Sequence, residues 1–365
     1  MGSPSATDIQ PCIVQACSAR SLRFAENGPM SEPDATAAVA ERYGRFARDD
    51  APGRSARYAQ WAAGVATDPA AVAVLARIPP VHRQPPLVFA VTRLLGAPDA
   101  PYPQWAAWLA DHADAVVAEC GRRSLQTNEP LRCAALLPAL SLIDGPIALL
   151  EVGASAGLCL YPDRYSYRYS TPAGSTVALD PADGPSAVVL SCALRGDAPP
   201  ALRMPDVVWR AGIDLHPLDA RSAADRAWLT GLVWPGETGR VERVRVALDV
   251  AAADPPELYE GDAVDTLTSA AALAPPDATL VVTTPGVLAH VPRAGRERII
   301  AGARAAGRWI TLDAPALHDA WHPAIDSAGW PAGAFALALD GAVLAAADPL
   351  GRFLEWRAGQ TPARP

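Results

Sequence analysis

Residues 147–157 read IALLEVGASAG, and this stretch decides the fold. It opens with a short, continuous apolar run that ends in an acid and a glycine, which is typical of a strand buried on both faces. The small residues that follow, in the pattern E-x-G-x-S-x-G, let the backbone approach a ligand closely. In doubly wound sheets such a loop follows the first strand, where nucleotide ligands bind. The stretch predicts a first strand with a binding loop, and a tight turn without a ligand is the alternative.

Strands and helices alternate after this loop. Further strands are predicted at residues 207–214, 258–262, 278–284 and 308–312, with helices at 223–232, 240–252 and 293–306. Asp340-Gly341 lies between two apolar runs, 334–339 and 342–346, and is a strong signal for a two-residue hairpin turn. We therefore expect an α/β fold in which residues 145–365 form a Rossmann-like, doubly wound, mostly parallel sheet with a C-terminal antiparallel hairpin.

The N-terminal part of the chain has a helical pattern. Helices are predicted at residues 36–48, 85–95, 102–123 and 129–142, and another is predicted to start with Asp68 as N-cap and Pro69 as its first residue. We expect residues 35–144 to form an N-terminal helical cap domain that helps to close the substrate site. Residues 1–34 lack periodicity and are expected to form a disordered tail, in which Met30 is a candidate for the biological start.

The distance from Gly157 to Asp214 is too long for a simple connection. The two are 57 positions apart, whereas one crossover helix needs roughly 20–30 residues. We therefore expect a β insertion at about residues 161–206, beside the loop. Tyrosines and arginines at its start, among them Tyr165 and Arg168, either grip an anionic or aromatic substrate or cover the surface of a twisted hairpin.

Composition excludes several enzyme classes. The chain has 365 residues and no lysine, so all 31 of its Lys and Arg residues are arginine. This excludes Schiff-base lysines, lysine-bound pyridoxal phosphate, P-loop lysines and kinase lysines. Any anionic group of a substrate must then be held by arginine, which recognises carboxylates in a planar, bidentate manner.

Charge and cysteine usage limit the partners. The formal net charge of −8 argues against a protein that mainly grips nucleic acid. Six scattered cysteines form no paired CxxC motif, so neither a zinc site nor a disulfide framework is indicated, and we predict no bound metal. No apolar run reaches the roughly 18 residues of a membrane span, and the N-terminus lacks a secretion signal. We expect a cytoplasmic protein that acts on a small molecule, without nucleic-acid or membrane partners.

The chain resembles the class I S-adenosylmethionine-dependent methyltransferases. The resemblance rests on the E-x-G-x-S-x-G motif and on acids at the ends of the next two predicted strands. It implies that the loop backbone approaches the methionine end of the cofactor, that Asp214 accepts the ribose hydroxyls, and that Asp262 contacts the adenine amino group. The residues so implied to bind S-adenosylmethionine are Glu151, Gly153, Ser155, Gly157, Asp214 and Asp262. The alternative for the two aspartates is an ordinary acid in a strand-end turn.

At closer range the chain resembles an uncharacterised, largely actinobacterial family known only as a domain of unknown function. The matching stretches are residues 41–47, 126–129, 149–160, 209–219 and 348–356, so the resemblance extends from about residue 35 to 358. This chain has Cys159 and His216 where the family usually has Asn, and Thr284 and Leu350 where it usually has His. If those histidines are catalytic in relatives, this protein is altered or inactive.

The function that follows is methyl transfer from S-adenosylmethionine to an oxygen, nitrogen or carboxylate of a small acceptor. His290 and His216 are the candidate proton acceptors, and ordinary surface histidines are the alternative. Candidate substrate-binding residues are Gln126, Asn128, Glu129, Arg132, Tyr165 and Arg168. For the polar cluster of residues 126–129 the alternative is a helix cap, in which Thr127 or Asn128 caps the helix that starts at Pro130. The competing functions are a catalytically silent or non-methylating cofactor-binding scaffold and, less consistent with the loop spacing, a nucleotide-binding oxidoreductase.

Overall fold

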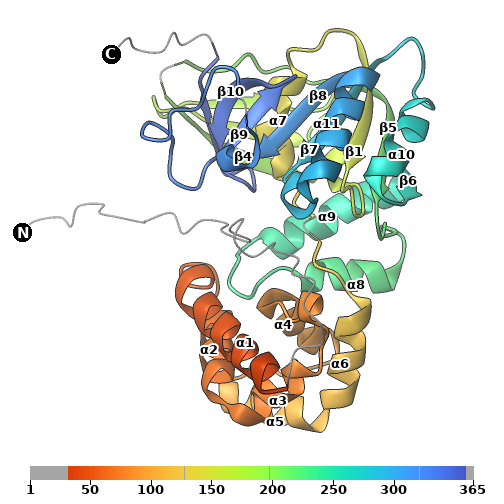
Figure 1. Cartoon of the computed structure of the whole chain (residues 1–365). Helices are drawn as coiled ribbons and strands as arrows, with labels where there is room; N and C mark the ends of the chain where they lie inside the picture. The colour runs from red at the N-terminus through yellow and green to blue at the C-terminus, as the bar shows by residue number, and fades with distance from the viewer. Residues whose placement is uncertain (1–31, 127, 197, 320, 359–365) are drawn as a thin grey trace, which may run out of the picture. The chain divides into compact units, whose positions relative to one another are not determined.

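A computed structural model describes residues 32–126, 128–196, 198–319 and 321–358, which divide into two compact units. Unit 1 consists of the described residues up to Ser124 together with the short segment Trp234–Glu237. Unit 2 consists of the other described residues. Figure 1 traces the chain through both units. The predicted tail lies outside the described residues up to residue 31, and the first helix begins inside its predicted range, at Glu32.

Helices dominate unit 1. They are α1 (Glu32–Arg45), which continues into a π-helical turn (Phe46–Asp50), α2 (Ala56–Thr67), α3 (Pro69–Ala76), a 3-10 turn (Pro80–His82), α4 (Pro85–Leu94), α5 (Tyr102–Asp111) and α6 (Ala113–Arg122). The predicted cap of α3 is confirmed, because the Asp68 carboxylate accepts hydrogen bonds from the backbone N–H groups of Ala70 and Ala71. The single helix expected at 102–123 is wrong, since His112 leaves the helical conformation and separates α5 from α6.

Unit 2 is built on one sheet of eleven strands among the described residues. They are β1 (Pro146–Val152), β2 (Ser166–Ser170), β3 (Thr176–Leu179), β4 (Val189–Arg195), β5 (Asp206–Asp214), β6 (Glu257–Glu260), β7 (Thr279–Pro285), β8 (Arg308–Asp313), β9 (Phe335–Leu339), β10 (Ala342–Ala347) and β11 (Phe353–Trp356). Their order across the sheet is β3-β2-β4-β11-β10-β9-β8-β7-β1-β5-β6. The run from β8 to β6 is wholly parallel. A mixed α/β fold with a mostly parallel sheet is thereby confirmed.

The sheet is packed on both faces. Its helices are α7 (Arg132–Leu140), α8 (Ala223–Gly231), α9 (Arg240–Ala253), α10 (Ala263–Ala271) and α11 (Arg293–Ala306). Because side chains alternate along a strand, Leu149 of β1 packs with residues of α7 and α9, whereas Leu150 packs with residues of α10 and α11. Figure 1 shows α10 and α11 side by side over the parallel strands. This double burial explains why β1 reads as a continuous apolar run.

The insertion and the C-terminal hairpin join the same sheet. The hairpin of β9 and β10 is confirmed, and Asp340 and Gly341 both take positive φ at its turn. Strands β2, β3 and β4 all lie within the predicted β insertion, whereas β11 was not predicted. Since β4 pairs with β11, the insertion extends the sheet at the end far from β1 rather than only flanking the loop.

Helix length and polarity bear on the membrane. Among the helices of the described residues, none combines the length and apolar character that a membrane span requires.

Candidate functional site

The candidate site lies where the carboxyl ends of the parallel strands meet. Strand β1 is central, with β5 on one side and β7 on the other. The loops that leave β1, β5, β7 and β8 therefore share one edge of the sheet. This edge carries Glu151 on β1, Asp214 at the end of β5 and Asp313 at the end of β8.

Asp214 clamps the loop that follows β1. Its Oδ2 accepts a hydrogen bond from the Ser155 N–H at 2.7 Å, and its Oδ1 accepts one from the His216 N–H at 2.9 Å. The loop needs this support because Gly153, Ser155 and Gly157 all have positive φ, which is uncommon for a serine. The acid that the methyltransferase resemblance assigned to a ribose thus holds the loop in shape.

The segment before α7 lies against the same loop. Ser155 Oγ donates to Gln126 Oε1 at 2.9 Å, and Gln126 Nε2 donates to the His216 carbonyl at 2.8 Å. Asn128 Oδ1 accepts a hydrogen bond from the Ala156 N–H at 3.3 Å. Asn128 therefore does not cap α7, which begins after Leu131 without a side-chain cap. Thr127 lies outside the described residues.

Glu129 is the most buried charge in this segment. Its side chain is fully buried, and it forms ion pairs with Arg240 at 2.7 Å and Arg243 at 2.8 Å. Its Oε1 also accepts a hydrogen bond from the Leu131 N–H. Both arginines lie on α9, three positions apart, so they project from one side of that helix. This pair of arginines was not predicted, and the only signal for it in the sequence is the three-residue spacing on a predicted helix.

Two buried polar atoms near the loop have no hydrogen-bond partner among the described residues. They are Oε2 of Glu151 and Nδ2 of Asn128. Burial raises the pKa of Glu151 well above its ordinary value, and the charges of Cys159 and Asp214 raise it further, whereas Arg132 lowers it. Glu151 is therefore held in its protonated form more readily than a free glutamate. Buried polar groups are normally paired, so these two atoms are candidates for contact with a ligand.

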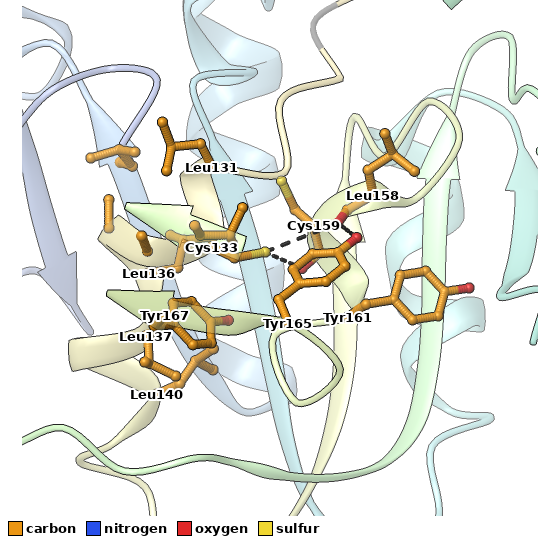
Figure 2. Packing of buried hydrophobic residues seen from close by; sticks show 14 of the residues in the cluster. Leu131, Cys133, Leu136, Leu137, Leu140, Leu158, Cys159, Tyr161, Tyr165 and Tyr167 are labelled. Atoms are coloured by element: carbon orange, nitrogen blue, oxygen red, sulfur yellow. Dashed lines mark hydrogen bonds between the residues drawn. The ribbon is translucent and has the colours of Figure 1, made fainter. Parts of the chain in front are cut away.

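Arg132 ties three segments together. Its Nε donates to the Pro349 carbonyl at 3.0 Å, and its Nη1 donates to the Pro285 carbonyl at 3.1 Å. The same guanidinium lowers the pKa of Cys159, although the main cause is a hydrogen bond from the Cys133 thiol. Figure 2 shows the Cys133 side chain pointing toward the backbone of Leu158 and Cys159. Arg132 is thus already engaged by backbone carbonyls.

Three further residues that were predicted to bind substrate or cofactor form no hydrogen bond, among the described residues, with the side chains that hold the loop after β1. Tyr165 is fully buried, and its hydroxyl donates to the Leu158 carbonyl (Figure 2). Arg168 lies on β2 and pairs with Asp180 at 2.9 Å, at the far end of the sheet. Asp262 is exposed after β6, where its carboxylate caps α10 through the Val264 N–H.

The two candidate histidines are both exposed, and they differ in electrostatic surroundings. His290 follows β7 in a 3-10 turn, Leu288–His290. Partial desolvation lowers its pKa, the Arg132 charge lowers it further, and Asp313 raises it. At neutral pH its imidazole is therefore neutral. His216 contributes its backbone N–H and carbonyl to the loop network described above.

A family model described as "Uncharacterized protein conserved in bacteria (DUF2332)" matches residues 40–356. The chain belongs to this family. The resemblance to a domain of unknown function is thereby confirmed, and the match carries no evidence of a methyltransferase relationship. No curated protein and no solved structure matches the chain.

In this DUF2332 protein, Thr284 and Leu350 occupy the two positions at which the sequence comparison led us to expect histidine. Thr284 is fully buried, where it accepts a hydrogen bond from Trp309 Nε1 at 3.0 Å and donates one to Thr311 Oγ1 at 2.9 Å. Leu350 lies in a C-terminal turn that Asp348 organises by accepting its backbone N–H. Both positions are therefore accommodated by the surrounding structure, and neither leaves a gap where a histidine was expected.

Replacing Glu151 by glutamine is expected to stabilise the protein in a pH-dependent way. Because the pKa of Glu151 is raised on folding, wild type loses stability as pH rises above the ordinary value of 4.5 toward the folded value. Glutamine carries no proton to lose, so the advantage of E151Q is absent at pH 4 and grows toward pH 8. Thermal unfolding measures this, at about 2–4 °C for each kcal/mol gained. E260Q, at an exposed glutamate of β6, is the control, and equal shifts at both pH values for E151Q would contradict the assignment.

Proposed function

We propose that unit 2 is a Rossmann-like domain that binds S-adenosylmethionine and transfers its methyl group to a small-molecule acceptor. The observation that carries the proposal is the strand order β6-β5-β1-β7-β8, wholly parallel, with the glycine loop directly after the central strand. Glu151, Asp214 and Asp262 then stand at the carboxyl ends of three neighbouring strands. Ligands of open α/β sheets bind in the crevice at such an edge.

The residues present fit the cofactor. The unpartnered Glu151 Oε2 and Asn128 Nδ2 suit the ammonium and carboxylate of its amino-acid end. The Asp214 carboxylate uses one lone pair on each oxygen for the loop and retains others for a ribose. A side chain at Gly153 would overlap Val287, so this glycine also serves the packing of the loop.

The chemistry of the step places modest demands on the protein. When bound, S-adenosylmethionine supplies an electrophilic methyl group, and the displacement needs mainly alignment of the acceptor. Asp214, Gln126 and Asn128 fix the loop against which the cofactor lies. His290 is exposed and neutral, and it is suited to accept a proton from the acceptor. The charge of Arg132 lowers the pKa of His290, and the charge of Asp313 raises it.

A second candidate is a cofactor-binding scaffold without methyl transfer. The observation that favours it is the complete hydrogen bonding of Thr284 inside the protein, with Trp309 and Thr311 as partners. A side chain so enclosed offers nothing to a substrate. In this alternative the same loop and acids bind the cofactor, and no acceptor is turned over.

Calorimetric titration with S-adenosylmethionine, S-adenosylhomocysteine and NAD tests cofactor binding. We expect wild type to bind both sulfur compounds and not NAD. The D262A substitution is expected to weaken binding by about tenfold through the loss of one hydrogen bond. D265A is the matched control, because Asp265 is an equally charged, exposed residue in the first turn of the same helix. Failure of wild type to bind either sulfur compound would overturn the proposal.

A second measurement separates the two candidates. Wild type is incubated with S-adenosylmethionine and a panel of small alcohols, amines and carboxylic acids, and S-adenosylhomocysteine is quantified. Turnover that falls in H290N but persists in H216N supports methyl transfer with His290 as proton acceptor. Cofactor binding without turnover across the panel supports the scaffold.

A further inference from the structure

A cavity of about 220 Å³ lies beside α11 in unit 2, apart from the cofactor loop. One wall comes from α11 and includes Arg296, Ile300 and Arg304, which share one side of the helix. The opposite wall comes from Trp309 at the start of β8 and from His318 and Trp321 in the segment that follows this strand. None of the residues that line it belongs to the loop or acids of the proposed cofactor site.

The aromatic wall is compact. The His318 ring lies 4.5 Å from the Trp321 ring, edge to face, and 5.9 Å from the Trp309 ring. Trp321 Nε1 donates to the Pro315 carbonyl at 2.7 Å, which fixes the indole. Rings held in this way supply apolar contact at low cost in side-chain entropy.

A buried chain of hydrogen bonds anchors this wall from behind. Trp309 Nε1 donates to Thr284, Thr284 donates to Thr311, and Thr311 donates to Asp313 Oδ2. His318 Nε2 lies 2.9 Å from the same carboxylate oxygen. Thr284, Thr311 and Asp313 are all fully buried. Since Nε2 of His318 is engaged there, Nδ1 is the ring nitrogen left for a ligand.

The helical wall carries positive charge that the protein does not neutralise. Arg293, at the end of the cavity, pairs with Glu297 at 2.9 Å and with Asp319. By contrast, the side chains of Arg296 and Arg304 form no ion pair or hydrogen bond with any residue that the structure describes. Their guanidinium groups are therefore available to a carboxylate or phosphate.

We propose that this cavity binds a small aromatic anion. The ring of the ligand lies among Trp309, His318 and Trp321, and its carboxylate or phosphate pairs with an arginine of α11. Arg296 and Arg304 are eight residues apart, about 12 Å along a helix, so a compact ligand engages one of them. The volume is below the roughly 300–1,000 Å³ of sites for drug-sized ligands, which favours one or two rings. The proposal is independent of the cofactor site.

Titration calorimetry on the full chain tests the proposal with four kinds of probe. Benzoate and indole-3-carboxylate present a ring with a carboxylate, and phenyl phosphate presents a ring with a phosphate. Benzamide presents a neutral ring, and acetate and inorganic phosphate present the anion alone. We expect the aromatic anions to bind at least tenfold more tightly than benzamide or the simple anions. The tighter class, carboxylate or phosphate, identifies the anionic group.

Variants of α11 locate the site. R296A or R304A is expected to weaken the tightest probe by about 10–100-fold, since a hydrogen bond to a charged group contributes about 1.5–3 kcal/mol. R298A is the matched control, because Arg298 is an exposed arginine of the same helix that does not line the cavity. The proposal is overturned if no aromatic anion binds wild type at millimolar concentration, if benzamide binds equally well, or if R296A and R304A both bind like R298A. D262A is expected to leave this binding unchanged.

Discussion

Replacement of Glu129 by alanine is expected to cost unit 2 about 3–5 kcal/mol of its free energy of unfolding, the cost of breaking a buried ion pair by removing one partner. The Glu129 side chain is fully buried, and the side chains of Arg240 and Arg243 are 12% and 23% exposed. Without the carboxylate, two mostly desolvated positive charges face each other. The Leu131 N–H also loses its acceptor.

Hydrogen exchange of the β1 and β5 amides measures this effect in unit 2 alone, since these strands form the centre of its sheet. E242A is the matched control, because Glu242 lies on the same helix as the two arginines, is 60% exposed and pairs only at the surface with Arg245. It should cost less than about 1 kcal/mol. E129Q keeps the shape and an acceptor oxygen, and it should fall between the two. Equal protection in E129A and E242A would show that the buried ion pair contributes nothing to stability.

Local patterns explain which parts of the fold could be predicted. The apolar run of β1, the Asp340-Gly341 turn and the Asp68 cap each depend on neighbouring residues, and all three occur as expected. Helix α10 was not predicted; it has only nine residues and follows directly after the strand predicted at 258–262. The pairing of β4 with β11 joins segments far apart in the chain, which no periodicity in a single sequence reports.

In the candidate site, too, some features could be predicted from the sequence and others could not. The sequence pointed to Gln126, Asn128, Ser155 and Asp214 as candidate binding residues. The fold brings them into one hydrogen-bonded network around the loop after β1. The sequence did not predict their partners, because a carboxylate or amide suits a backbone N–H as well as a ligand hydroxyl. Arg132 illustrates this ambiguity: it was expected to bind substrate, whereas its guanidinium donates hydrogen bonds to the carbonyls of Pro285 and Pro349.

Replacement of Gly351 by alanine is the second change with a large expected effect. Gly351 has a φ of +91°, which costs an L-residue about 1–2 kcal/mol. A Cβ there would also overlap the carbonyl of Leu131 and approach the Arg132 N–H group, which are backbone atoms and cannot turn aside. Overpacking adds about 1–3 kcal/mol. We therefore expect a total loss of about 2–5 kcal/mol in the free energy of unfolding.

Gly174 separates the two contributions to that loss. It has a φ of +81° in the turn between β2 and β3, and a Cβ there would meet no atom within 4 Å. G174A therefore carries the conformational cost alone, about 1–2 kcal/mol, and denaturant unfolding of both variants gives the packing cost by difference. Because Arg132 reaches Pro349 across the same contact, G351A should also speed hydrogen exchange at the start of α7, which G174A should leave unchanged. If the two variants lose equal stability, the C-terminal turn does not pack on Leu131, and the hold of Arg132 on this edge of the sheet must rest on Pro285 alone.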